Sequence, residues 1–320
     1  MADKLPETLG ELGEFGLIEA LTARFAQGEQ VLLGPGDDAA VVRLASRELV
    51  TSLDMLIQNQ HFRLDWSSAV DIGRKAAAVN LSDINAMGGT ASALVVGLGA
   101  PAELDTQWAL DFAGGLAEEV AKVGASVVGG DLSRARDISI AVAVVGDCEH
   151  GVVRRAGARP GDIVAHVGRQ GWAEAGYAVL ARGFRSPRVV VEAHRRADPP
   201  YAAGPQAAVL GATAMIDVSD GLLQDIGHLA AASGVTIDVE TARFDLPEPL
   251  QAVGAALGVD PMRFVLTGGD DYGLVATFPD GTELPESWRA IGRVVEADRR
   301  GGVLVDGAAY GEPAGHQHFR

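Results

Sequence analysis

Residues 67–102 read SSAVDIGRKAAAVNLSDINAMGGTASALVVGLGAPA. The serine pair at 67–68 can cap a helix that runs to Met87, and the glycine pair at 88–89 can end it. The stretch from Ile84 to Ala102 carries no charge and is nearly long enough to span a bilayer. Five glycine and proline residues interrupt it, so it reads as a helix end, a turn and a buried strand. The pattern predicts a fold that mixes helices and strands.

Composition narrows the classes of function. The 320 residues allow two domains of about 150 residues each. A net charge of -17 would repel phosphate backbones and anionic lipid, which argues against nucleic acid and membranes as partners. Cys148 is the only cysteine, so no intramolecular disulfide can form, as is typical of a reducing cytoplasm. The first fifteen residues lack the apolar run of a signal peptide.

The organisation along the chain predicts a domain boundary near residue 150, between a domain at 1–150 and a domain at 151–320. Strands are expected at 125–128, at 138–145 and, after a turn, at 163–167. The second of these lacks polar alternation, as a strand covered on both sides would. Strands and helices mix in both halves, so the fold class is α/β or α+β with two domains.

Aspartates are the most informative feature. Most follow a predicted strand or a glycine turn, and each has neighbours that should be buried. Asp83 lies inside an apolar helix, one helical step from Asn80 and on the same face. The set comprises Asp37, Asp38, Asp54, Asp83, Asp131, Asp217, Asp220, Asp270 and Asp271.

Metal binding explains this set best. A buried ionised carboxylate needs a partner, and basic residues are scarce near these positions. A hard cation such as Mg²⁺, Mn²⁺ or Ca²⁺ suits all-oxygen ligands, and the chain has no EF-hand spacing. A single Asp after a strand is more often a turn former or a helix cap, and Asp105 and Asp162 are assigned those roles. For Asp83 the structural alternative is a satisfied buried hydrogen bond.

Several bound Mg²⁺ ions usually indicate phosphate substrates. The sequence has neither the G-x-x-x-x-G-K-[ST] loop nor the H-R-D and D-F-G motifs, which excludes P-loop proteins and protein kinases. The glycines at 34, 36 and 129–130 are only weak signals for phosphate binding.

The order of motifs resembles the thiamine-monophosphate kinase family, which is related to aminoimidazole ribonucleotide synthetase and selenophosphate synthetase. The likeness runs almost from end to end. The motifs are GDDAA at 36–40, SLDML at 52–56, HF at 61–62, AVNLSDI at 78–84, AMG at 86–88, GGD at 129–131, RAGARPGD at 155–162, DVSDGL at 217–222, GGDDY at 268–272 and GHQHF at 315–319.

The resemblance implies an N-terminal mixed-sheet domain that forms a homodimer and a C-terminal α/β domain that completes the ATP and substrate site. It implies ATP as co-substrate with several Mg²⁺ ions, and thiamine monophosphate as acceptor, in the last step of thiamine diphosphate biosynthesis. The implied metal ligands are Asp38, Ser52, Leu53, Asp54, Asp83, Asp131, Asp217 and Asp220. The implied ATP contacts are Gly130, Asp131, Arg155 and Ser219. The implied acceptor contacts are His61, Asp270 and His316.

Three positions depart from the family pattern. Leu53 stands where Thr is usual, so only its backbone carbonyl could be a ligand. Asp270 replaces the longer Glu, and His316 replaces Tyr or Trp, which would stack better on a cationic thiazolium. Two alternatives stay open: a sister enzyme that uses ATP on another acceptor, and a metal or nucleotide sensor without turnover, which the Leu53 departure favours.

The expected chemistry is direct in-line transfer without a phosphoenzyme. The acceptor monoester is largely dianionic at pH 7, so no side chain has to remove a proton. Aspartates are expected to hold metal ions, and none is expected to act as nucleophile, acid or base.

Overall fold

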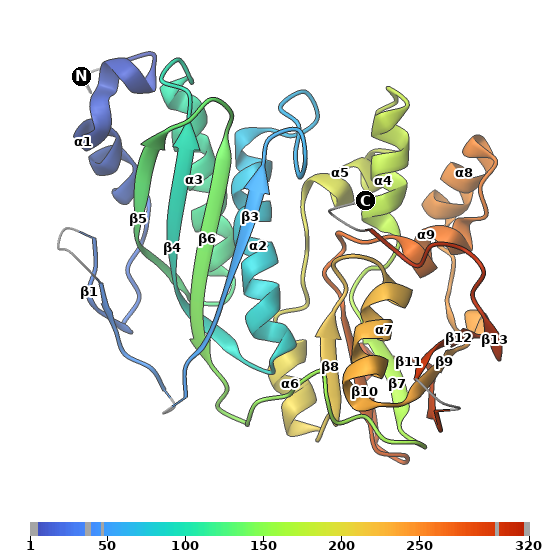
Figure 1. Ribbon diagram of the computed structural model, residues 1–320. Helices are drawn as coiled ribbons and strands as arrows, with labels where there is room; N and C mark the ends of the chain where they lie inside the picture. The colour runs from blue at the N-terminus through green and yellow to red at the C-terminus, as the bar shows by residue number, and fades with distance from the viewer. Residues whose placement is uncertain (1–5, 36–39, 46–47, 298–300, 317–320) are drawn as a thin grey trace. The chain divides into compact units, whose positions relative to one another are not determined.

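The computed structural model describes residues 6–35, 40–45, 48–297 and 301–316 (Figure 1). The chain forms two compact units. The first comprises Met1–Ile84 and Thr90–Glu149, and the second comprises Asn85–Gly89 and His150–Arg320.

Unit 1 consists of a helix-covered sheet preceded by a helix and a short hairpin. The sequence-based helix from 69 to 87 is confirmed, because α2 spans Ala69–Ala86 and Ser68 bonds reciprocally with Asp71 in its first turn. The elements are α1 (Leu9–Thr22), β1 (Val31–Leu33), β2 (Val41–Val42), β3 (Val50–Ile57), α2 (Ala69–Ala86), β4 (Thr90–Ala100), α3 (Thr106–Ala121), β5 (Ser126–Arg134) and β6 (Ser139–Asp147).

The main sheet of unit 1 has the strand order β3-β6-β4-β5. β6 pairs antiparallel with both β3 and β4, whereas β4 and β5 are parallel. Helices α2 and α3 cover one face of this sheet (Figure 1). They approach each other closely at two glycines: a Cβ on Gly73 would lie 2.0 Å from the carbonyl oxygen of Phe112, and one on Gly115 would lie 2.1 Å from that of Val70.

Two strand predictions in unit 1 were wrong in detail. β5 does not end at Val128: it continues through the glycine pair to Arg134, because pairing with β4 holds it extended, so Asp131 lies inside the strand. Within the single chain, β6 is covered on one face only. Its residues alternate between buried and half-buried, since Ala141 and Ala143 place small apolar side chains on the face away from the helices.

Unit 2 contains a seven-stranded sheet with the order β13-β12-β9-β11-β7-β10-β8. The predicted strand at 163–167 is confirmed as β7. The elements are β7 (Ile163–Val167), α4 (Trp172–Ala181), α5 (Arg188–Arg195), α6 (Ala203–Val209), β8 (Ala214–Asp217), α7 (Leu222–Ser233), β9 (Thr236–Val239), the 3₁₀ helix η1 (Thr241–Arg243), α8 (Glu248–Leu257), α9 (Pro261–Thr267), β10 (Leu274–Phe278), β11 (Arg289–Val295), β12 (Gly302–Val305) and β13 (Ala308–Ala309).

Apolar cores cover both faces of this sheet. One core joins alternate strand residues such as Val275 to Leu222 and Ile226 of α7. The other joins the intervening residues, such as Ala276, to Ala203 and Ala207 of α6. β10 is buried at every position because it lies between the two cores. Helix α7 therefore begins at the carboxyl end of β8 and packs on the sheet, which fixes the loop between them.

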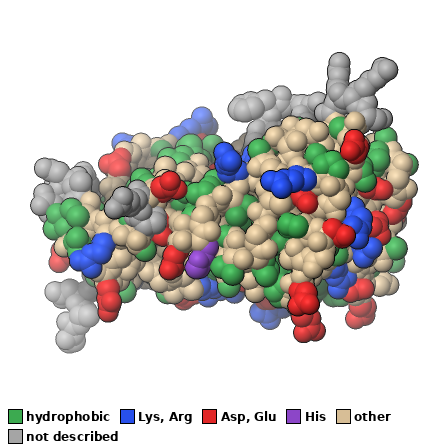
Figure 2. All heavy atoms as spheres, turned by 90° about the horizontal axis from the view of Figure 1, so that it is seen from below, with side chains coloured by type: hydrophobic (Ala, Val, Ile, Leu, Met, Phe, Trp, Pro, Cys, Tyr) green, Lys and Arg blue, Asp and Glu red, His purple; other side chains and the backbone are tan. Residues whose placement is uncertain are grey.

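The surface carries both signs of charge. On the face in Figure 2, acidic and basic side chains lie intermixed with apolar ones. Within the described ranges, no helix combines the length and the apolar character needed to cross a membrane.

Candidate active site

Strand β3 and helix α2 bring three polar side chains of unit 1 together. The hydroxyl of Ser52 donates to Oδ2 of Asp83 over 2.5 Å. Oδ1 of the buried Asn80 accepts from the backbone N–H of Asp54 at 3.0 Å, and its amide nitrogen donates to the carbonyl of Ala76. The predicted helix face that joins Asn80 to Asp83 is confirmed, and it faces β3. Asp83 is half-buried, so it is not the fully buried carboxylate that the apolar neighbours suggested.

The side chain of Leu53 lies on the opposite face of β3. Successive strand residues alternate in direction, and Ser52 points toward α2. Leu53 is 58% exposed, as expected for the face without helices. A threonine hydroxyl at this position would therefore point away from the Ser52–Asp83 pair.

Asp131 is separated from that pair. In the sheet register, Asp131 is level with Gly97, Ala141 and Met55, so its side chain lies on the face of Leu53 rather than that of Ser52. It is exposed, and Ser133 donates to its Oδ2 at 3.2 Å. Gly130, its predicted companion, passes so close to β4 that a Cβ would lie 2.1 Å from the carbonyl oxygen of Val96.

His61 follows β3 in a tight turn. Its Nδ1 accepts the backbone N–H of Ile57 at 2.9 Å, so the neutral ring carries its hydrogen on Nε2. Lys75, which is buried, donates to the carbonyl of His61 at 3.4 Å. Asp37 and Asp38 lie outside the described residues.

The loop between β8 and α7 is the centre of the predicted site in unit 2. Asp217 ends β8 and is 6% exposed, whereas Ser219 and Asp220 are half-buried. Gly221 adopts φ 136°, and a Cβ there would lie 2.6 Å from the carbonyl oxygen of Thr267. The predicted strand-to-helix turn at these aspartates is thus confirmed.

Two predicted acceptor residues contact this loop through their backbones. Asp270 donates its N–H to the carbonyl of Ser219 at 2.8 Å, and His316 donates its N–H to the carbonyl of Asp220 at 2.9 Å. Asp270 has φ 69° and places Oδ2 3.8 Å from Nδ1 of His194. The structure therefore brings Ser219, Asp220, Asp270 and His316 together, although Ser219 and His316 are almost 100 residues apart in sequence.

Two buried carboxylates, Asp225 and Asp271, lie beside this loop. Asp271 belongs to the aspartate set that the sequence assigned to metal binding, whereas Asp225 was missed at the sequence level. Oδ2 of Asp225 accepts the N–H groups of Ser219, Asp220 and Gly221 at 3.0, 3.0 and 3.1 Å. Burial raises the pKa of Asp225 to about 7 against the opposing effect of these hydrogen bonds. The signal in the sequence was a carboxylate on the apolar face of α7, three residues after Leu222 and four residues before Leu229.

Asp271 likewise accepts backbone N–H groups, at the start of α4. Its two carboxylate oxygens accept the N–H groups of Trp172 and Ala173 at 3.0 Å each, which anchors the loop to the first turn of α4. Burial raises the pKa of Asp271 to about 7. Burial, followed by the charge of Asp270, also raises the pKa of Glu174 in the same turn.

Arg155, predicted to contact ATP, lies at the other end of α7. Its carbonyl accepts from Ser233, the last residue of α7, whereas Ser219 precedes the first turn. Twelve helical residues span about 18 Å, so the structure does not place the backbones of Arg155 and Ser219 together. The two assigned structural aspartates are confirmed: Asp105 caps α3, and Asp162 accepts from the N–H of Arg159 and the hydroxyl of Thr213.

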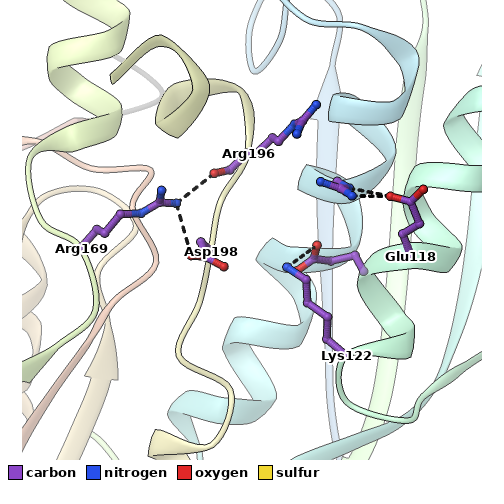
Figure 3. A network of polar contacts seen from close by, with 7 residues as sticks. Glu118, Lys122, Arg169, Arg196 and Asp198 are labelled. Atoms are coloured by element: carbon purple, nitrogen blue, oxygen red, sulfur yellow. Dashed lines mark hydrogen bonds and ion pairs between the residues drawn. The ribbon is translucent and has the colours of Figure 1, made fainter. Parts of the chain in front are cut away.

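Figure 3 shows basic side chains that bind acceptors other than the predicted site aspartates. Arg169 donates to the carbonyl of Arg196 at 3.2 Å and lies 4.0 Å from Asp198, and Lys122 pairs with Glu119 at 2.9 Å. Among the residues that the structure describes, no three His, Cys, Asp or Glu side chains form a group that could hold a metal ion.

Comparisons with known proteins place this geometry in a family. Residues 36–148 match the family model of the AIR synthase related protein, N-terminal domain. The chain is 46% identical to a thiamine-monophosphate kinase of Mycobacterium tuberculosis, covering 98% of this chain and 93% of that protein. It is 34% identical to a thiamine-monophosphate kinase of Aquifex aeolicus, covering 97% and 99%. The chain belongs to the thiamine-monophosphate kinase family. The resemblance seen in the motifs is confirmed.

Solved structures of the family share the fold. The thiamine-monophosphate kinase of Stenotrophomonas maltophilia matches with a TM-score of 0.82 and 30% identity, covering 93% of this chain and 98% of that one. A structure of AaThiL complexed with AMPPCP and TMP matches with a TM-score of 0.78 and 33% identity, covering 99% and 100%. The hydrogenase maturation protein HypE, at 19% identity and a TM-score of 0.70, shares the fold. The predicted α/β class is confirmed.

Proposed function

We propose that this enzyme transfers the γ-phosphoryl group of ATP to thiamine monophosphate, giving thiamine diphosphate and ADP. The observation that carries the proposal is the backbone pairing of Asp270 and His316 with Ser219 and Asp220. These residues match family motifs for the acceptor and for ATP with its metals, and they meet on one loop. A family member described as complexed with AMPPCP and TMP supports the same pair of substrates.

We propose Mg²⁺ as the metal that accompanies ATP. The donors are all oxygens, which suits a hard cation: unit 1 offers the hydroxyl of Ser52 and the carboxylate of Asp83, and unit 2 offers the carboxylates of Asp217 and Asp220. The proposed ligands remain Asp38, Ser52, the carbonyl of Leu53, Asp54, Asp83, Asp131, Asp217 and Asp220. Bound Mg²⁺ supplies positive charge that offsets repulsion between the phosphates, about 4 kcal/mol per charge pair at 4 Å and an effective dielectric of 20.

The residues of the chain are proposed to bind and orient rather than to move protons. A phosphate monoester with a second pKa of about 6 is already a nucleophile at pH 7. Gly130, Asp131, Arg155 and Ser219 are proposed to contact ATP, and His61, Asp270 and His316 to contact the acceptor. In-line transfer then needs positioning and charge compensation, with no phosphoenzyme.

The exposed face of the unit 1 sheet supports the proposed homodimer. Leu53, Met55 and Val95 are 58%, 49% and 42% exposed, and the register places Leu53 and Val95 in one row across Ala143. A second copy of this chain would cover such a row of apolar side chains. The cytoplasmic location and the absence of nucleic-acid or membrane partners stay predictions from the sequence.

The sensor alternative rested on the Leu53 departure, and this geometry removes that reason. The side chain at position 53 points away from Ser52 and Asp83, so a leucine there removes no donor from that pair. The proposed function is tested by ADP release from Mg-ATP with thiamine monophosphate, thiamine or no acceptor. We expect release with the monophosphate alone and none in excess EDTA. Equal release with no acceptor, or undiminished turnover in EDTA, would contradict it.

A further inference from the structure

The first turn of α7 contacts two segments that carry predicted site residues. Asp225 binds the backbone of the loop that precedes the helix, and its neighbour Gln224 binds the segment that holds His316. Neither residue belongs to the motif positions that the family resemblance assigns to ATP, metal or acceptor.

Asp225 fixes the course of the loop. Its Oδ2 receives three successive N–H groups, from Ser219, Asp220 and Gly221. Converging N–H groups before a helix form an anion-binding nest, and here the carboxylate of the helix itself fills it. The nest is therefore closed to a phosphate, and the same three hydrogen bonds fix the backbone from which the side chains of Ser219 and Asp220 project.

Gln224 ties this loop to the C-terminal segment. Its amide nitrogen lies 3.2 Å from Oδ2 of Asp220 and 2.6 Å from the carbonyl oxygen of His316. An amide has two hydrogens, so one group serves both acceptors. The N–H of His316 returns a bond to the carbonyl of Asp220. Gly315 permits this approach, since a Cβ there would lie 2.5 Å from the same carbonyl oxygen.

We propose that Asp225 and Gln224 are positioning residues: Asp225 holds the loop that presents Ser219 and Asp220, and Gln224 couples the orientation of Asp220 to the placement of His316. The inference deepens the proposed function and rests on it. Asp225 acts through backbone hydrogen bonds, so holding the loop requires its accepting oxygen and does not require its negative charge. Gln224 acts at the acceptor side, so its loss should affect thiamine monophosphate more than ATP.

The kinetics of two Asp225 variants distinguish the effect of its accepting oxygen from the effect of its charge. Asp225→Asn keeps an oxygen that can accept the three N–H groups, and we expect its kcat to stay within about threefold of the wild type. Asp225→Ala removes the acceptor, and we expect kcat to fall at least tenfold at a temperature where the variant is folded. A metal ligand or general base at this position would instead make Asp225→Asn as inactive as Asp225→Ala, which would overturn the proposal. Asp105→Asn, in the cap of α3, is the matched control.

Two Gln224 variants test the coupling. Gln224→Leu should raise the KM for thiamine monophosphate five- to twentyfold and change the KM for ATP less than twofold. Gln224→Glu should be at least as severe, because it cannot donate and it repels Asp220. Gln251→Leu removes a similar amide-to-carbonyl bond in α8 and should change neither KM. Equal changes in both KM values, or none, would overturn the coupling. If Asp225→Ala does not fold, the Gln224 variants still test the coupling, and an inactive Asp225→Asn would still overturn the role of Asp225.

Hydrogen exchange gives a readout that does not depend on turnover. In the wild type the amides of Ser219, Asp220 and Gly221 should be protected; exchange should accelerate at least tenfold in Asp225→Ala but not in Asp225→Asn. Gln224→Leu should accelerate exchange at His316. If the wild type shows this pattern without phosphorylating thiamine monophosphate, the proposed function fails alone. If turnover is normal and no variant alters exchange, the positioning inference fails.

Discussion

The hydroxyl of Ser52 donates to Oδ2 of Asp83 across 2.5 Å and so joins the edge strand β3 to helix α2. The two residues are 31 positions apart, and the bond holds the Asp83 carboxylate on the helix face that Asn80 shares. The carboxylate proposed as a Mg²⁺ ligand is therefore held in place by a hydrogen bond within unit 1.

Replacing Asp83 by Asn tests that interpretation. The change removes a charge and keeps the volume, so we expect at least a hundredfold loss of kcat at ordinary Mg²⁺. Thermal stability without metal should be retained or slightly raised. Activity and melting temperature measured over a Mg²⁺ titration provide the check. Asp111→Asn, an exposed helical aspartate that accepts from Gln107, should behave as the wild type. Near-normal turnover would make Asp83 purely structural.

Replacing Leu53 by Thr should have little effect on the metal requirement. The side chain lies on the face opposite Ser52, so the new hydroxyl cannot join the Ser52–Asp83 pair. We expect the Mg²⁺ concentration for half-maximal activity to change less than about tenfold, equivalent to about 1.4 kcal/mol. A large rescue of an almost inactive wild type would instead support the sensor alternative.

Charging the exposed face of the unit 1 sheet should separate the proposed homodimer. Met55 is 49% exposed and lies in the row of Asp131, so Met55→Lys would place a cation where a second copy is expected to pack. Light scattering should show a dimer for the wild type and a monomer for the variant. Val209→Lys, at a 64% exposed position in unit 2, should remain dimeric. A monomeric wild type would refute this part of the account.

Buried His166 should make folding stability depend on pH. Burial, with a smaller contribution from Arg289, lowers its pKa to about 4 from 6.5. Below pH 6.5 the unfolded chain binds a proton that the folded chain does not, so stability is lost as pH falls toward 4. Between pH 7.5 and pH 5 the wild type should lose about 2 kcal/mol more unfolding free energy than His166→Leu. Denaturant titrations at the two pH values measure this, and equal losses would show that the histidine is protonated while folded.

Local features were predictable because they depend on near neighbours in sequence. The helix spacing of Asn80 and Asp83, the cap at Asp105 and the strand at 163–167 all follow from periodicity and capping preferences, and all are found. The order of motifs identified the family before any geometry was known. The acceptor-side roles of Asp270 and His316 were assigned by resemblance alone and stay predictions.

Features that depend on long-range pairing were not predictable. Glycines 129 and 130 indicated the end of a strand, but pairing with β4 carries β5 past them to Arg134. The direction of the Asp131 side chain follows from that register, which no local pattern specifies. Asp225 and Gln224 were missed because their partners are mainly backbone groups, whose positions depend on how the chain folds.

The most direct measurement of the central claim is a phosphorus NMR spectrum of a reaction with Mg-ATP and thiamine monophosphate. The account predicts that the monophosphate signal of the acceptor is replaced by the two signals of thiamine diphosphate, with one ADP formed for each acceptor consumed. Formation of inorganic phosphate while the thiamine monophosphate signal stays unchanged would contradict it.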